Sequence, residues 1–118
     1  LHGAKVLLLG LAFKKNIEDV RESPALRVFE LLKEKGADVT FYDPFVDELP
    51  KHHMPAAIAG EKSIVWNKAA LKNFDAAVIL TDHDDIDYAA VASEIPVIVD
   101  TRNAMARKNL ASEKVFPA

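Results

Sequence analysis

The sequence predicts a doubly wound α/β domain with a parallel sheet. Short runs at 4–9, 76–80 and 96–99, which are continuously apolar apart from Lys5, are typical of strands that helices cover on both faces. Helical patterns separate these runs, and parallel neighbours require such crossover helices. The chain has 118 residues, half of them hydrophobic, which suits one compact domain. We therefore expect residues 1–118 to form a single domain with three α/β/α layers, a Rossmann-like architecture.

The first strand, over 4–9, leads into a turn with a single glycine. A dinucleotide-binding fingerprint would place three glycines here, but only Gly10 is present and residues 11–13 all carry side chains. The loop instead offers cations, among them Lys14 and Arg21. The layout is therefore that of a nucleotide-binding strand-to-helix turn without the glycine-rich cradle.

The first helix is predicted from its two ends and its apolar stripe. Ser23 can cap it, and Pro24 fits the first helical position, where its missing N–H costs nothing. Gly36 can adopt the left-handed conformation that ends a helix. The stripe that faces the core is formed by Ala25, Val28, Phe29 and Leu32.

The rest of the chain continues the alternation of strand and helix. Asn67 can cap one further helix, and Asp84 or Asp85 can cap another. Residues 45–62 form a long connection without a clear pattern, and the end of the chain shows only weak periodicity. We expect the other strands at 38–42, 63–66, 76–80 and 96–99.

Numbered along the chain, these strands can be arranged in the order 3-2-1-4-5. The winding direction then reverses between the first and fourth strands, and ligands bind beyond the carboxyl ends of the strands at such a switch point. This rule selects three loops, 10–21, 81–85 and 100–103. Because these are also the loops richest in polar and charged residues near strand ends, we expect a binding site there.

Four cations in these loops have two interpretations each. Lys14 and Lys15 can be solvated lysines, or they can add positive charge beside a helix N-terminus that already favours phosphate. Arg21 and Arg102 can form surface ion pairs worth about 0–1 kcal/mol, or they can clamp a phosphate or carboxylate with two hydrogen bonds. The switch-point rule favours the ligand-binding interpretation for Arg102.

Acidic and imidazole groups suggest a metal site, but we predict none. The run 82–85 is rich in carboxylates, and carboxylates at a helix start more often act as caps. His52 and His53 are adjacent in a loop and do not share a helix face. Asp43 ends the second strand, where a Rossmann domain keeps its ribose-binding acid, although a strand-ending Asp-Pro turn explains it equally well.

Composition excludes several classes of protein. The 15 basic and 18 acidic residues give a net charge of -3, which argues against nucleic acid or an anionic membrane as a partner. The chain has no cysteine, which excludes disulfides and a cysteine nucleophile. No apolar run approaches the roughly 18 residues of a membrane span, so we expect a cytoplasmic protein. The chain begins with Leu1 instead of methionine, which indicates a fragment of a longer protein.

Four motifs together resemble one known family. In order along the chain they are Gly10 to Pro24, Tyr42-Asp-Pro44, Thr81-Asp-His83 and Val99-Asp-Thr-Arg-Asn103. They are similar to motifs in the C-terminal, UDP-binding domain of the UDP-glucose/GDP-mannose dehydrogenase family, and the resemblance covers nearly the whole chain. The residues of these motifs most resemble those of the branch that oxidises UDP-N-acetylmannosamine or UDP-N-acetylglucosamine at C6.

The resemblance implies that this chain is part of an NAD-dependent enzyme. Such enzymes oxidise C6 of a UDP-sugar to the UDP-uronic acid in two hydride transfers. Their N-terminal domain holds NAD and the catalytic cysteine, and a central helix supports dimerisation. We therefore expect this domain to bind the UDP-sugar, to work with the N-terminal and central domains of the same protein, and to be inactive alone. The parent is expected to be a homo-oligomer.

The resemblance also implies roles for individual residues. Phe13 and Lys14 would contact the nucleotide sugar, and Arg102 would reach its UDP part. Arg21 would approach the NAD held by the other domain. We expect no catalytic residue and no metal ligand in this chain.

Two alternatives also follow from the α/β pattern. A receiver-like regulatory domain has a similar size, but it needs an aspartate after its third strand, where this chain has Trp66 and Asn67. A stand-alone nucleotide-binding domain, specific for NAD or sensing redox state, is the other alternative. The missing glycines argue against it.

Overall fold

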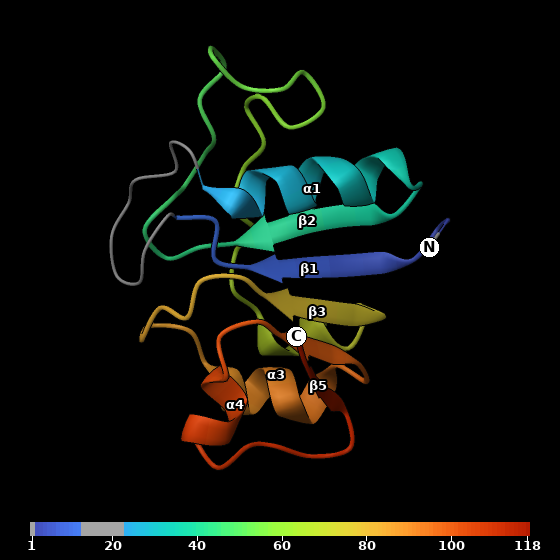
Figure 1. The fold of residues 1–118 in the computed structure, drawn as a ribbon, viewed down its shortest axis with the longest axis vertical. Helices are drawn as coiled ribbons and strands as arrows, with labels where there is room; N and C mark the ends of the chain where they lie inside the picture. Colours follow the sequence, from blue (N-terminus) through green and yellow to red (C-terminus); the bar gives the residue numbers. More distant parts are fainter. Residues whose placement is uncertain (1, 13–22) are drawn as a thin grey trace.

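The computed structural model describes residues 2–12 and 23–118, and it confirms the α/β architecture. Within these residues the sheet has five strands in the order β2-β1-β3-β4-β5, all parallel. In Figure 1 the arrows of β2, β1 and β3 lie side by side and point the same way. The strands are β1 (Lys5–Leu9), β2 (Asp38–Tyr42), β3 (Ala76–Ile79), β4 (Ile98–Asp100) and β5 (Val115–Pro117). The helices are α1 (Pro24–Glu34), α2 (Lys68–Leu71), α3 (Tyr88–Glu94) and α4 (Ala104–Arg107).

Side chains cover both faces of the sheet because alternate residues of each strand point in opposite directions. Leu8 of β1 belongs to a buried cluster on the α1 side, where the rings of Phe29 and Phe41 meet edge to face at 5.9 Å. Leu7 belongs to a second cluster that includes residues of α2, α3 and α4. The sheet is therefore doubly wound, as predicted.

Helix α1 has the ends that its sequence predicts. Ser23 is extended, and its hydroxyl oxygen accepts a hydrogen bond from the backbone N–H of Ala25 at 3.3 Å. Gly36 follows the helix with a φ of 88°, the left-handed conformation expected at a helix end. Because α1 returns across the sheet from β1 to β2, its N-terminus lies at the carboxyl ends of the strands.

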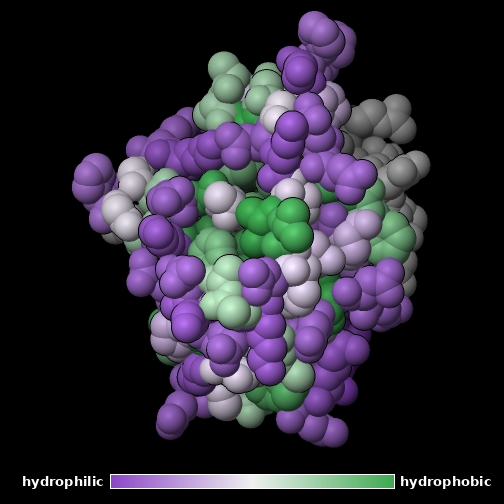
Figure 2. All heavy atoms as spheres, turned by 180° about the vertical axis from the view of Figure 1, so that it is seen from behind, coloured by the Kyte–Doolittle hydropathy of each residue, from purple (hydrophilic) through white to green (hydrophobic). Residues whose placement is uncertain are grey.

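The predicted strand at 63–66 is wrong, although this segment lies beside β2. The N–H of Ile64 donates to the carbonyl of Phe41 at 2.9 Å, but a strand ladder needs repeated backbone pairs. The next side chain, Val65, is 88% exposed. Seen from behind, the molecule shows hydrophobic side chains near the middle of a largely hydrophilic face (Figure 2).

The fifth strand of the sheet is β5, near the end of the chain, where the sequence shows only weak periodicity. It pairs with β4 at the edge opposite β2. The order of the other four strands is as predicted. Helix α3 also begins later than expected, since its cap is Asp87, whose carboxylate accepts from the N–H of Ala90 at 3.1 Å, and neither Asp84 nor Asp85. No helix in the described ranges is long and apolar enough to cross a membrane.

Candidate functional site

The carboxyl ends of β3 and β4 face the N-terminus of α1 at the predicted switch point. The chain leaves β1 through α1 towards β2, whereas β3 pairs with the other side of β1. A hollow of about 240 Å³ lies between these elements. It is lined by Ser23, Pro24, Ala25, Val28, Leu80, Thr81, Thr101 and Arg102. The loops that follow β3 and β4 therefore meet at one site, as the topology rule requires.

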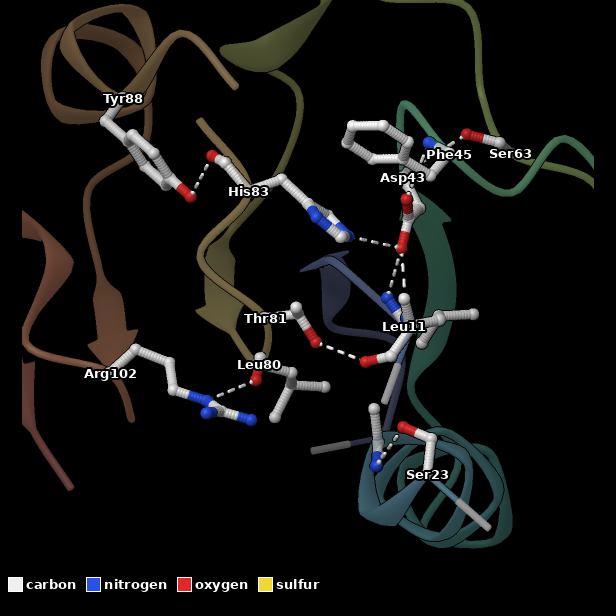
Figure 3. A network of polar contacts seen from close by, with 12 residues as sticks. Leu11, Ser23, Asp43, Phe45, Ser63, Leu80, Thr81, His83, Tyr88 and Arg102 are labelled. Atoms are coloured by element: carbon white, nitrogen blue, oxygen red, sulfur yellow. Dashed lines mark hydrogen bonds and ion pairs between the residues drawn. The ribbon is translucent and has the colours of Figure 1, made fainter. Parts of the chain in front are cut away.

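Arg102 stands in the wall of this hollow with part of its guanidinium anchored. Its Nε donates to the carbonyl oxygen of Leu80 at 2.9 Å (Figure 3). Its backbone N–H donates to Asp100 Oδ1 at 3.0 Å. Within the described ranges, no contact occupies its two terminal nitrogens. Those nitrogens can therefore donate to an anion, and the bond to Leu80 limits the orientations that the side chain can adopt.

The N-terminus of α1 adds a second source of positive potential. Aligned peptide dipoles place roughly half a positive charge at the start of a helix, where anions bind favourably. Ser23, the cap of this helix, and Pro24, its first residue, both line the hollow. The hollow thus combines a guanidinium with a helix start.

The acidic residues near the hollow are engaged by protein groups. Asp82 forms an ion pair with Arg107. The buried carboxylate of Asp100 accepts from the backbone N–H groups of Ala104 and Met105 at 3.1 and 2.8 Å, which holds the start of α4. These contacts offset much of the negative charge that would repel a bound anion. In the part of the chain that the structure describes, no group of three acidic, histidine or cysteine side chains is arranged to hold a metal ion.

A buried pair, Asp43 and His83, lies beside the hollow. Asp43 is 1% exposed and His83 is fully buried. The Nε2 of His83 lies 3.0 Å from Asp43 Oδ2, which also accepts from the backbone N–H groups of Leu11 and Ala12 at 2.8 and 3.0 Å (Figure 3). The other oxygen, Oδ1, accepts from the N–H of Phe45 at 2.8 Å. Asp43 therefore has a structural role, and its carboxylate is not open to a ribose.

Two opposing effects determine the pKa of Asp43. Burial by itself would raise this pKa, but the hydrogen bond from His83, followed by those from the backbone N–H groups of Leu11, Phe45 and Ala12, outweighs it. The pKa of the carboxyl is held below its ordinary value of 3.8. Asp43 is therefore ionised at neutral pH, and Nε2 of His83 carries the proton that it donates.

Two further hydrogen bonds join this pair to its surroundings. The hydroxyl of Tyr88 donates to the backbone carbonyl of His83 at 2.9 Å, and the ring of Phe45 lies against the imidazole with 4.8 Å between centroids. The hydroxyl of Thr81 donates to the carbonyl of Ala12 at 2.6 Å. The ends of β1, β2 and β3 are thus tied together next to the hollow.

The structure describes only some of the predicted site residues. Arg102 lies in the hollow, whereas Phe13, Lys14 and Arg21 lie outside the described residues, as does Lys15. The sequence interpretation missed the role of His83. One signal was available, because Asp43 and His83 follow strands that flank β1 on its two sides and so reach the same edge of the sheet.

A larger hollow, of about 330 Å³, lies away from the switch point. It lies along β2 and α2, is lined mainly by apolar atoms and includes the side chains of Ile64, Val65 and Phe74. Two charged residues line it, Lys5 and Asp38, and their charges are opposite. This surface does not suit a polyanion, and the smaller hollow beside Arg102 is the better anion site.

The chain is similar to known proteins over most of its length. Residues 7–107 match the UDP binding domain of the UDP-glucose/GDP-mannose dehydrogenase family. A UDP-glucose 6-dehydrogenase of Bacillus subtilis is 37% identical over 106 residues, which cover 86% of this chain and 23% of that protein. A UDP-N-acetyl-D-mannosamine dehydrogenase of Methanococcus maripaludis is 32% identical over 111 residues, covering 86% of this chain and 23% of that protein.

Solved structures show the same fold. An NDP-N-acetyl-D-galactosaminuronic acid dehydrogenase from Methanosarcina mazei superposes with a TM-score of 0.72 at 28% identity, over 99% of this chain and 24% of that chain. A UDP-N-acetyl-mannosamine dehydrogenase from S. aureus gives a TM-score of 0.70 at 28% identity, over 99% of this chain and 27% of that chain.

The chain spans about a quarter of the length of these relatives. The family match covers the ends of β3 and β4 and the N-terminus of α1, which enclose the hollow. It favours a UDP-binding domain of this family over a receiver-like or stand-alone regulatory domain. The chain belongs to the UDP-glucose/GDP-mannose dehydrogenase family, whose UDP binding domain it matches from residue 7 to residue 107.

Proposed function

We propose that residues 1–118 form the UDP-sugar-binding, C-terminal domain of an NAD-dependent UDP-sugar 6-dehydrogenase. The whole protein would oxidise C6 of the sugar to a carboxylate in two hydride transfers. The observation that carries this proposal is the hollow in which the guanidinium of Arg102 faces the N-terminus of α1. Both groups favour the charge of a diphosphate.

The proposed roles of the site residues follow the family resemblance. Arg102 holds the diphosphate of UDP, while Phe13 and Lys14 contact the nucleotide sugar. Arg21 approaches the NAD bound by the N-terminal domain. The hollow of about 240 Å³ is smaller than the roughly 300–1,000 Å³ of a typical ligand pocket, so it suits part of the ligand and leaves the rest to other segments.

The described residues do not form a cradle for NAD itself. A β-carbon at Gly10 would lie 2.4 Å from the backbone oxygen of Thr81, so this glycine allows two strand ends to touch and leaves no space for a pyrophosphate. NAD would therefore bind mainly to the N-terminal domain. When bound there it would accept the hydride.

This domain would contribute binding energy and no chemistry. Contacts to the remote UDP would hold the sugar so that C6 reaches the reacting groups of the N-terminal domain. The chain has no cysteine to form a covalent intermediate, so a pure preparation of it should show no dehydrogenase activity. We further propose that the parent is a cytoplasmic homo-oligomer that binds neither nucleic acid nor membranes.

Thermal unfolding with UDP, and separately with NAD, tests the proposal. A ligand at a hundred times its Kd stabilises a protein by about 2.7 kcal/mol, which should raise the midpoint of this domain by several degrees. We expect UDP to produce this shift and Arg102→Ala to abolish it. The exposed Arg27, on the outer side of α1, is a matched control whose change to alanine should leave UDP binding intact.

Other outcomes would contradict the proposal. A shift with NAD alone would favour a stand-alone NAD-binding domain. If the shift with UDP persists in Arg102→Ala, the nucleotide binds at another surface. If UDP gives no shift up to millimolar concentrations, this chain does not bind UDP.

A further inference from the structure

The carboxylate of Asp43 is the point where three strand ends are held together. Asp43 follows β2, Leu11 and Ala12 follow β1, and His83 follows β3. Three donors from two of these ends converge on the single oxygen Oδ2, at distances of 2.8 to 3.0 Å. A neutral side chain could not match this arrangement, since an ionised oxygen accepts several hydrogen bonds and strengthens each of them.

His83 is held from two other directions. The ring of Phe45 lies against its imidazole, and the hydroxyl of Tyr88 fixes its backbone carbonyl. The imidazole is fully buried, so its orientation relative to Asp43 is determined by packing as well as by hydrogen bonding. His83 therefore keeps one donor directed at the carboxylate.

The effect of this pair extends to the hollow through Ala12 and Thr81. Asp43 fixes the N–H of Ala12, and the carbonyl of Ala12 accepts from the hydroxyl of Thr81 at 2.6 Å. Thr81 lines the hollow together with Arg102. The backbone of Thr81 also lies directly against Gly10, so a displacement of the end of β1 would displace Thr81 as well.

We propose that Asp43 and His83 are positioning residues for nucleotide binding, which hold Ala12 and Thr81 so that the hollow beside Arg102 keeps the shape that receives the diphosphate. Neither side chain lines the hollow. The inference rests on the proposed function and adds to it two residues that act without touching the ligand.

The test compares four variants by calorimetric titration with UDP. Asp43→Asn can satisfy the donors at one oxygen but places an N–H₂ group against those at the other. His83→Phe removes the donor, whereas His83→Gln can replace it with an amide N–H. We expect the Kd for UDP to rise by about tenfold or more in Asp43→Asn and His83→Phe, and His83→Gln to restore most of the affinity.

Asp75→Asn is the matched control. Asp75 Oδ2 accepts from the backbone N–H of Lys5 at 2.8 Å, so it holds the same strand β1 at its opposite end. This variant should lose stability without losing affinity for UDP. Titrations at a temperature well below every unfolding midpoint separate the two effects. The amide signals of Leu11 and Ala12 in NMR spectra should shift in Asp43→Asn and not in Asp75→Asn.

The possible outcomes separate this inference from the proposed function. If the unmodified chain does not bind UDP, the proposed function fails and the inference fails with it. If that chain binds UDP, but Asp43→Asn and His83→Phe bind equally well while the two amide signals move, only the inference is overturned. Should Asp43→Asn fail to fold, the difference between His83→Phe and His83→Gln decides, and equal affinities overturn the inference.

Discussion

Gly10 lies so close to Thr81 that a β-carbon on Gly10 would stand 2.4 Å from the Thr81 carbonyl oxygen. Gly10 also has a φ of 85°, which side chains disfavour. Glycine at this position therefore satisfies two requirements, a left-handed backbone and contact between the ends of β1 and β3. Since Thr81 lines the hollow, this contact also determines where one of its walls stands.

Gly10→Ala should destabilise the fold by more than about 2 kcal/mol. The left-handed conformation alone costs alanine about 1–2 kcal/mol, and the contact with the Thr81 backbone adds to it. Gly3→Ala is the matched control, because Gly3 has a φ of 80° but nothing within 4 Å of its added β-carbon. Urea unfolding should show the smaller loss for Gly3→Ala, and equal losses would argue against the close contact.

Arg102→Lys should bind UDP more weakly than the unmodified chain and more strongly than Arg102→Ala. Lysine keeps the charge but loses both the Nε bond to Leu80 and the paired donors of a guanidinium. Calorimetric titration of the three proteins checks this order. An affinity for Arg102→Lys equal to that of the unmodified chain would show that charge alone is needed.

The low pKa of Asp43 predicts how stability depends on acid. Because the folded pKa lies below the ordinary 3.8, the stabilising contribution is present above that pH and is lost as pH falls through the folded pKa. Asp43→Asn should be less stable at neutral pH by about 1–3 kcal/mol, since buried donors lose their ionised partner. The free energy of unfolding of this variant should also fall less steeply in acid than that of the unmodified chain. Urea unfolding of both proteins from pH 6 downwards tests this. Parallel plots of unfolding free energy against pH would contradict it.

Both tyrosines should ionise at a higher pH in the folded protein than in the unfolded chain. Burial raises the pKa of Tyr88, with further contributions from the carboxylates of Asp82, Asp100 and Asp84. The pKa of Tyr42 is also raised above its ordinary 10.0. Burial is the largest cause, and the negative charges of Asp43 and Asp85 add to it.

At pH 10 the absorbance at 295 nm should therefore show clearly less than half of the tyrosine ionised, against about half in urea. Stability should decline as pH rises above about 10, because the unfolded chain then loses these protons more readily. An absorbance equal to that in urea, measured while the protein stays folded, would contradict the raised pKa values of the two tyrosines.

Local patterns predicted the elements whose structure depends on a few neighbouring residues. Helix α1 follows from Ser23, Pro24 and Gly36, and the structure shows the same cap and the same left-handed end. The buried strands β1 and β3 follow from short apolar runs, because a strand that is covered on both faces of the sheet needs apolar side chains on both. The placement of Arg102 at the switch point follows from topology alone.

Elements at the edges of the sheet could not be predicted in this way. The run 63–66 has apolar residues but makes one backbone bond to β2, while 115–117 becomes a strand because β4 offers it an open edge. A short segment acquires strand structure only from its partner, and the partner is not visible in its own sequence.

The sequence by itself determined the fold class, the family resemblance and the edge of the sheet that carries the site, because these depend on local periodicity and on motifs in order along the chain. Only the tertiary structure decided what Asp43 does. A carboxylate at the end of a strand could bind a ribose or hold a turn, and the outcome depends on which donors folding brings within 3.0 Å of it. Those donors come from residues 31 to 40 positions away, which local sequence does not specify.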